Sequence, residues 1–123
     1  MSQLVCRKTG TTYPLLSTRW KGEGDALLDV KHDLSFRIGD VQPNRAGLWR
    51  YRNAIPLPED TPLITQGEGF SPLIEMELKG RKVKLKLDHL FPSGSYKDRG
   101  ATALMTLAKA IGIKDVVQDS SGN

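Results

Sequence analysis

A lysine at the start of a predicted helix is the side chain of this sequence best suited to covalent chemistry. The stretch SGSYKDRG, residues 93–100, places Lys97 between a turn-forming segment and a run of apolar residues at helical spacing. The positive end of the helix dipole disfavours an ammonium there and favours the neutral amine that attacks carbonyl carbon. The pattern therefore indicates a lysine that bonds to a carbonyl compound. Position alone also fits a lysine that only points into solvent.

The residues around Lys97 predict how the turn is built. Ser95 is a good N-cap residue, and Asp98, three positions later, completes a capping-box pattern. Both residues are expected to organise the turn and not to touch a substrate. The helix should end at Gly112, a typical C-cap residue.

The elements on either side of this helix suggest an α/β fold. A turn at Gly80 precedes residues 82–87, where apolar and basic residues alternate as in a strand with one wet face. Residues 115–118 read as a second short strand. Strand, helix and strand would form a βαβ unit of an open parallel sheet, whose sites lie beyond the carboxyl ends of the strands. The turns at 91–97 and 119–123 are therefore expected to lie side by side.

The first half of the chain has a different character. Residues 1–31 carry turn signals between short apolar stretches, which predicts small hairpins or a ribbon-like lobe. A short helix is expected over 45–54, followed by an extended proline-containing connector. We expect an N-terminal lobe over 1–44 and the first part of an α/β domain over 45–123.

Composition narrows the classes of partner. The net charge of +4 suggests nucleic-acid binding, but the densest basic run, residues 79–87, reads as a solvated strand face. A single cysteine excludes an internal disulfide and fits a reducing compartment. No apolar run approaches the ~20 residues of a membrane span. A cytoplasmic protein without nucleic-acid or membrane partners is expected. Because the sequence stops just after the predicted strand at 115–118, it reads as a fragment.

Several motifs together resemble one enzyme family. Residues 90–100, LFPSGSYKDRG, resemble the lysine motif of the fold-type II pyridoxal-phosphate-dependent enzymes, in the form typical of threonine synthases. Residues 66–73, QGEGFSPL, resemble the upstream G-E-G-x-T-P-L of that family. Residues 48–52 resemble its W-R-Y segment, and residues 120–123, SSGN, resemble the start of its S-S-G-N loop. The motifs follow the family's order.

The resemblance implies roles for individual residues. Lys97 would bond covalently to pyridoxal 5′-phosphate and later shuttle protons. Asn123 would donate a hydrogen bond to the cofactor's 3′-oxygen. Ser120, Ser121, Gly122 and Asn123 would bind the substrate, with hydroxyls and backbone amides facing its α-carboxylate.

The implied reaction converts O-phospho-L-homoserine and water into L-threonine and phosphate, with a homodimer as a further expectation. The family's phosphate-binding loop lies downstream of residue 123, so the chain alone is expected to bind the cofactor poorly and to be inactive. Phe91 and Tyr96 replace the family's usual asparagine and phenylalanine. Another fold-type II reaction, such as that of threonine dehydratase or cysteate synthase, stays open, as does a truncated homologue without catalysis.

The N-terminal lobe resembles a zinc ribbon found in relatives. Residues 6–14 and 20–24 keep the frame of its cysteine-containing turns, but Cys6 is the single cysteine present. A tetrahedral zinc site needs four ligands. We therefore predict a degenerate, metal-free ribbon. His32 and His89 lie in no ligand or triad spacing.

Overall fold

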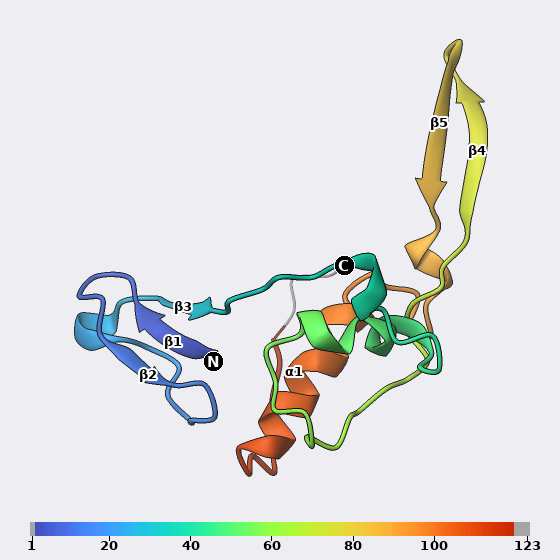
Figure 1. Ribbon diagram of the computed structural model, residues 1–123. Helices are drawn as coiled ribbons and strands as arrows, with labels where there is room; N and C mark the ends of the chain where they lie inside the picture. Colours follow the sequence, from blue (N-terminus) through green and yellow to red (C-terminus); the bar gives the residue numbers. More distant parts are fainter. Residues whose placement is uncertain (1, 120–123) are drawn as a thin grey trace.

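Three short antiparallel strands form the first sheet of the chain. The computed structural model describes residues 2–119, and its strand order here is β2-β1-β3. The strands and helices in chain order are β1 (Gln3–Cys6), β2 (Thr12–Pro14), η1 (Glu23–Asp25), β3 (Leu28–Lys31), η2 (Ile38–Asp40), η3 (Gly47–Ala54), β4 (Leu73–Leu78), β5 (Arg81–Lys86), η4 (Asp88–Leu90) and α1 (Asp98–Ala110), where η marks a 3₁₀ helix. Figure 1 shows this first sheet standing apart from α1 and joined to η2 and the rest of the chain through the extended stretch after β3.

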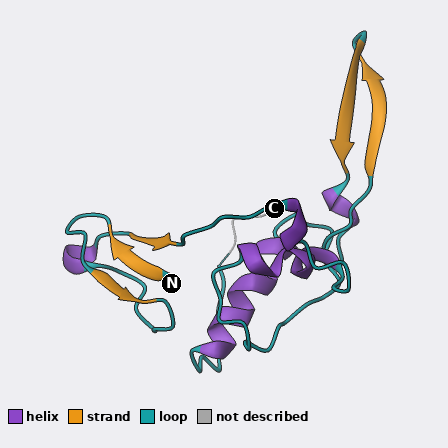
Figure 2. Ribbon diagram, in the orientation of Figure 1, coloured by secondary structure: helices purple, strands orange, loops and turns teal. Residues whose placement is uncertain are grey.

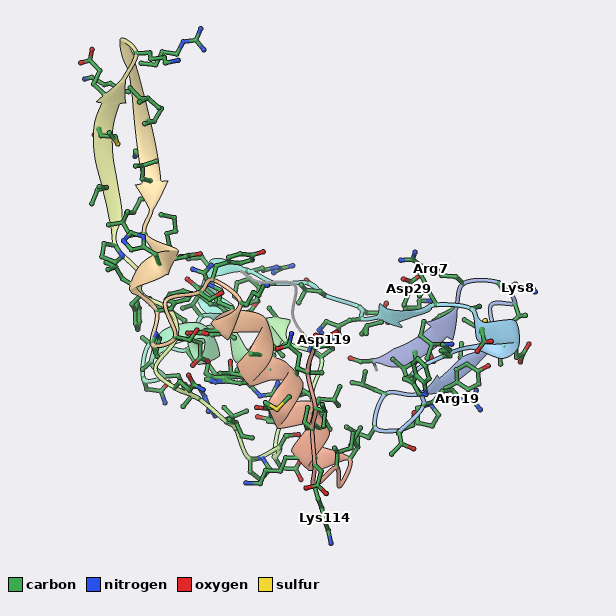
Figure 3. The ribbon with its side chains drawn as sticks, turned by 180° about the vertical axis from the view of Figure 1, so that it is seen from behind. Arg7, Lys8, Arg19, Asp29, Lys114 and Asp119 are labelled. Carbon is green, nitrogen blue, oxygen red and sulfur yellow. The ribbon has the colours of Figure 1, made fainter. Side chains whose placement is uncertain are left out.

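Cys6 is the buried centre of this small sheet. Its side chain is 1% exposed. The backbone of Gly22 lies so close that an added Cβ would be 2.5 Å from the Cys6 sulfur. On the outer surface, Arg7 and Asp29 form an ion pair at 2.6 Å between the loop after β1 and strand β3 (Figure 3). Residues 3–31 thus form the small antiparallel sheet that the turn signals predict.

The η3 helix is the short helix expected over 45–54, wound as 3₁₀ turns. Trp49 is buried and its indole N–H donates to the carbonyl of Ile64 at 3.1 Å. Arg52 is also buried, and its guanidinium donates to the carbonyls of Ile55 and Leu57 at 3.0 and 2.8 Å. These bonds satisfy the backbone of the proline-containing connector, which has no ladder of its own.

Helix α1 ends where the sequence predicts. Gly112 has φ +80°, a conformation open to glycine at low cost. Its N–H donates to Lys109 and the next N–H, of Ile113, donates to Ala108, at 3.1 and 2.9 Å. This pair of bonds is the Schellman arrangement that satisfies the last helical carbonyls.

Strands β4 and β5 form an antiparallel hairpin that projects away from α1 (Figures 1 and 2). Its turn residues, Lys79 and Gly80, both have positive φ, at 50° and 74°. Positive φ at both turn positions is the geometry that suits two-residue hairpins. One face is apolar and carries Met76 opposite Val83, and the other carries Glu75 bonded to Lys84 at 3.2 Å.

This hairpin corrects the predicted βαβ unit. The strand expected over 82–87 pairs with the strand just before it and not with one after the helix. Within the described residues both sheets are antiparallel, and 115–118 forms no strand. The physical reason is that the tight turn at Lys79 and Gly80 supplies an immediate antiparallel partner, whereas a parallel strand needs a partner across a long connection. The chain is therefore a mixed α/β protein without the predicted open parallel sheet in its described part.

No helix in residues 2–119 combines the length and the apolar character that crossing a bilayer requires.

Candidate active site

Lys97 lies at the boundary between the turn and helix α1. Its carbonyl accepts the first helical bond, from Ala101 N–H at 2.9 Å, and its own N–H donates to the Ser95 hydroxyl at 3.2 Å. Its side chain belongs to an exposed residue. Lys97 is thus the N-cap residue itself, so the prediction that Ser95 occupies this position is wrong by two residues.

The correction follows from what Asp98 binds. Its buried carboxylate accepts hydrogen bonds from the N–H of Ser93, at 3.0 Å, and from the Ser93 hydroxyl. The carboxylate therefore closes the turn at Ser93, two residues earlier than a Ser95 capping box would. Gly94, at φ +76°, lets the chain reverse inside this clamp. The backbone that carries Lys97 is fixed by a side chain on the helix it precedes.

A second clamp joins the helix start to the end of the hairpin. Arg99 makes a two-pronged ion pair with Asp88, with nitrogen–oxygen distances of 2.5 and 2.9 Å. The Ser71 hydroxyl donates to the same carboxylate at 2.6 Å. The bond from Ser71, followed by the bonds and charge of Arg99, holds the pKa of Asp88 below its ordinary value. A bidentate pair of this kind fixes orientation as well as charge.

A third contact comes from Glu68, which sequence reasoning did not place in the site. Its side chain is fully buried at 0% exposure. The carboxylate accepts from the hydroxyls of Thr102 and Thr65, at 2.7 and 2.9 Å, and from Gln66 N–H at 2.9 Å. Burial acts to raise the pKa of Glu68, but these hydrogen bonds outweigh it and the pKa lies below the ordinary value. In the sequence, the feature that could have drawn attention to Glu68 is its position between Gly67 and Gly69.

The segments that resemble family motifs are bonded to one another. Leu48 N–H donates to the carbonyl of Glu68 at 2.9 Å, which joins 48–52 to 66–73. Gly69 packs against this contact so closely that an added Cβ would lie 2.7 Å from backbone atoms of Gly47 and Leu48. Through Glu68 and Asp88, the same segments reach helix α1. Residues 120–123, where Ser120, Ser121, Gly122 and Asn123 were predicted to act, lie outside the described residues.

Part of the chain matches a known protein family. Residues 64–123 match the family model described as pyridoxal-phosphate dependent enzyme, a segment that contains Glu68, Lys97 and Asp98. Pyridoxal phosphate is the cofactor of that class. The expected resemblance is therefore confirmed for this part of the chain.

Several curated proteins that are similar to this chain are named threonine synthase. The chain is 29% identical over 128 residues to that of Methanocaldococcus jannaschii, covering 96% of this chain and 32% of the relative. It is 33% identical over 132 residues to that of Methanosarcina acetivorans, covering 100% of this chain and 32% of the relative. It is 39% identical over 83 residues to that of Halalkalibacterium halodurans, covering 64% of this chain and 23% of the relative. The chain thus spans about a third or less of each relative. The solved structures offer no significant match.

The described residues fit part of a pyridoxal-phosphate site. The cofactor is an aldehyde and bonds to an accessible amine, and Lys97 is exposed at the start of α1 on a clamped turn. The other predicted contacts lie beyond residue 119, outside the described part. The fit accordingly rests on the lysine and on the side chains that hold its backbone.

Proposed function

We propose that this protein acts in a pyridoxal-phosphate-dependent threonine synthase reaction, a carbon–oxygen lyase step that turns O-phospho-L-homoserine and water into L-threonine and phosphate. The observation that carries the proposal is the exposed Lys97 on a turn fixed by Asp98, inside the segment that matches the enzyme family. The similar proteins are named threonine synthase, which favours threonine as the product.

We propose the following roles for individual residues. Pyridoxal phosphate, when bound, supplies an electron sink for carbanion chemistry. Lys97 Nζ would hold it covalently and would accept and return a proton at the substrate carbon. Asp98 and Arg99 would keep the lysine backbone in place. We propose that Ser120, Ser121 and Gly122 bind the substrate carboxylate, and that Asn123 bonds to both cofactor and substrate.

Further features belong to the same proposal. The fold-type II architecture with its open parallel sheet is supported by the family match and not by the two antiparallel sheets. We propose an N-terminal lobe over 1–44 that holds no metal and a catalytic α/β part over 45–123. We also propose that the protein is a cytoplasmic homodimer. Its substrate would be a small amino acid, and it would have no nucleic-acid or membrane partner.

Covalent labelling tests the role of Lys97. The longest obtainable form of the protein is incubated with pyridoxal phosphate, reduced with borohydride, and digested for mass mapping, because the 123-residue chain alone is expected to bind the cofactor poorly. We expect the reduced label on Lys97 and its loss in Lys97→Ala. Lys109→Ala, a change at the far end of the same helix, is the matched control and should keep the label. A label spread over surface lysines in both variants would contradict the proposal.

The product that this form of the protein releases distinguishes the candidate reactions. Phosphate released from O-phospho-L-homoserine supports the synthase, whereas ammonia released from threonine would indicate a dehydratase. Labelling of Lys97 with neither product would point to a homologue that keeps the cofactor lysine without this catalysis.

A further inference from the structure

A cavity of about 140 Å³ lies where helix η3, the Gly69 turn, the end of β5 and the start of α1 meet. Three cationic side chains line it, and each comes from a different element: Arg50 from η3, Lys86 from β5 and Arg99 from α1. Arg99 is two residues after Lys97. The other lining residues come from segments to which the sequence analysis gave no ligand-binding role.

The surroundings of Arg50 indicate that the cavity binds a ligand. Its Nε atom is buried, and the described residues give it no hydrogen-bond partner. The guanidinium carbon lies 4.9 Å from the ring centre of Phe70 and 5.7 Å from that of Tyr51. The rings stabilise the cation but offer no acceptor in the plane of its N–H groups. A buried N–H donor without an acceptor is costly, so a missing partner for the Nε atom is indicated.

The charges in the cavity do not cancel. Arg99 is matched by Asp88, which it binds with both terminal nitrogens. Lys86 Nζ donates to the carbonyl of Ser71 at 2.5 Å, which uses one of its three N–H donors. Within residues 2–119, neither Arg50 nor Lys86 has a carboxylate in salt-bridge contact. Two positive charges are therefore left over beside a cavity.

Two glycines form one part of the wall, beside Leu48, Tyr51 and Phe70. Gly47 and Gly69 both line the cavity and both have positive φ, at 59° and 111°. A Cβ on either glycine would collide with backbone at 2.0 and 2.7 Å. These two positions therefore cannot carry side chains that would fill the space.

We propose that this cavity is a binding site for a phosphoryl group, held by Arg50 and Lys86. A guanidinium and an ammonium are the side chains that match a tetrahedral oxyanion, the first through paired N–H donors and the second as a point charge. The volume corresponds to a few waters at about 30 Å³ each, enough for a phosphoryl group and its hydration. The inference does not depend on the proposed reaction, because it concerns side chains other than Lys97 and needs no cofactor.

Titration with inorganic phosphate tests it. Calorimetry is run on the protein without pyridoxal phosphate, at constant ionic strength. The unaltered protein should bind with saturation at one site. Arg50→Gln and Lys86→Gln should each weaken binding about tenfold, the scale of one lost charge-assisted hydrogen bond. Arg81→Gln and Lys82→Gln, with the same charge change on the exposed part of the hairpin, are the matched controls and should stay within about twofold.

The second arm uses O-phosphoserine in place of phosphate. Equal losses for both ligands in Arg50→Gln identify the phosphoryl group of a small ester as an acceptable ligand. Binding of inorganic phosphate alone restricts the site to the free anion. Circular dichroism and thermal unfolding confirm that each variant is folded. Should Arg50→Gln not fold, Lys86→Gln with its Lys82→Gln control decides.

Two results would overturn the proposal. One is no saturable binding of either ligand by the unaltered protein, which would mean that water satisfies Arg50. The other is equal weakening in the cavity variants and the hairpin controls, which would show attraction by net charge and not by a site.

Discussion

The buried carboxylate of Glu68 accepts a hydrogen bond from the Thr102 hydroxyl at 2.7 Å, although 34 residues separate them. Thr102 also donates to the carbonyl of Asp98, at 3.1 Å, in the first turn of α1. The loop that carries Glu68 is therefore bonded to the same helical turn that follows Lys97.

Glu68→Gln should destabilise the protein. The amide would keep one acceptor oxygen but place N–H donors against the donors of Thr65, Thr102 and the Gln66 backbone. We expect a loss of about 1–3 kcal/mol in the free energy of unfolding, the cost of an unsatisfied buried group. Urea unfolding measures it. Glu77→Gln, on the exposed hairpin, should change stability by less than about 0.5 kcal/mol, and an equal loss in both would contradict the role of burial.

Acidification should weaken the fold through Glu68 and Asp88. Both carboxylates have pKa values below their ordinary values of 4.5 and 3.8. A lowered pKa in the folded state means that the stabilisation is complete above the ordinary value and is lost as pH falls through the folded value. We expect urea midpoints to be flat from neutral pH down to about 5 and to fall below that. The variant Asp88→Asn should show a shallower fall, and a steeper one would reverse the assigned sign.

Gly22→Ala should destabilise the first sheet. The new Cβ would lie 2.5 Å from the Cys6 sulfur, inside the buried centre of that sheet. Overpacking of this kind costs about 1–3 kcal/mol. Gly39→Ala is the matched control because nothing lies within 4 Å of its added Cβ. Adding Cys6→Ala to Gly22→Ala removes the sulfur and should recover part of the loss, and thermal unfolding of all four proteins gives the comparison.

Asp98→Asn should loosen the turn before Lys97. The carboxylate binds both donors of Ser93, whereas an amide offers a single acceptor oxygen. We expect faster amide hydrogen exchange at Ser93, by about tenfold, since one charge-assisted bond is lost. Asp115→Asn, in the irregular segment after α1, should leave that rate unchanged. An unchanged Ser93 rate in Asp98→Asn would show that the turn holds without the carboxylate.

Metal removal should leave the first sheet intact. The described residues contain no cluster of three or more metal-ligating side chains, and Cys6 is the single thiol. A chelator should therefore not change the thermal unfolding of residues 1–44, and elemental analysis should find zinc well below one equivalent. Stoichiometric zinc lost together with stability would contradict the predicted metal-free lobe.

The sequence alone located the features that depend on near neighbours. The spacing of apolar residues and the glycine at 112 are local, so helix α1 and its end follow from them. The position of Lys97 at the helix start follows in the same way. The family resemblance needed only the order of short motifs, and the match of residues 64–123 confirms it.

The tertiary structure decided which distant groups meet. Alternation predicted a strand over 82–87, which the structure has as β5, but not its partner, because pairing direction is set by the turn geometry and by the strands available. Glu68 looked like a loop residue, yet it is buried because Thr102 supplies a donor from another element. Asp88 and Arg99 are matched in the same way, and the unmatched charge of Arg50 appears only once these partners are known. Burial and charge balance are properties of the assembled chain, which is why local spacing could not reveal them.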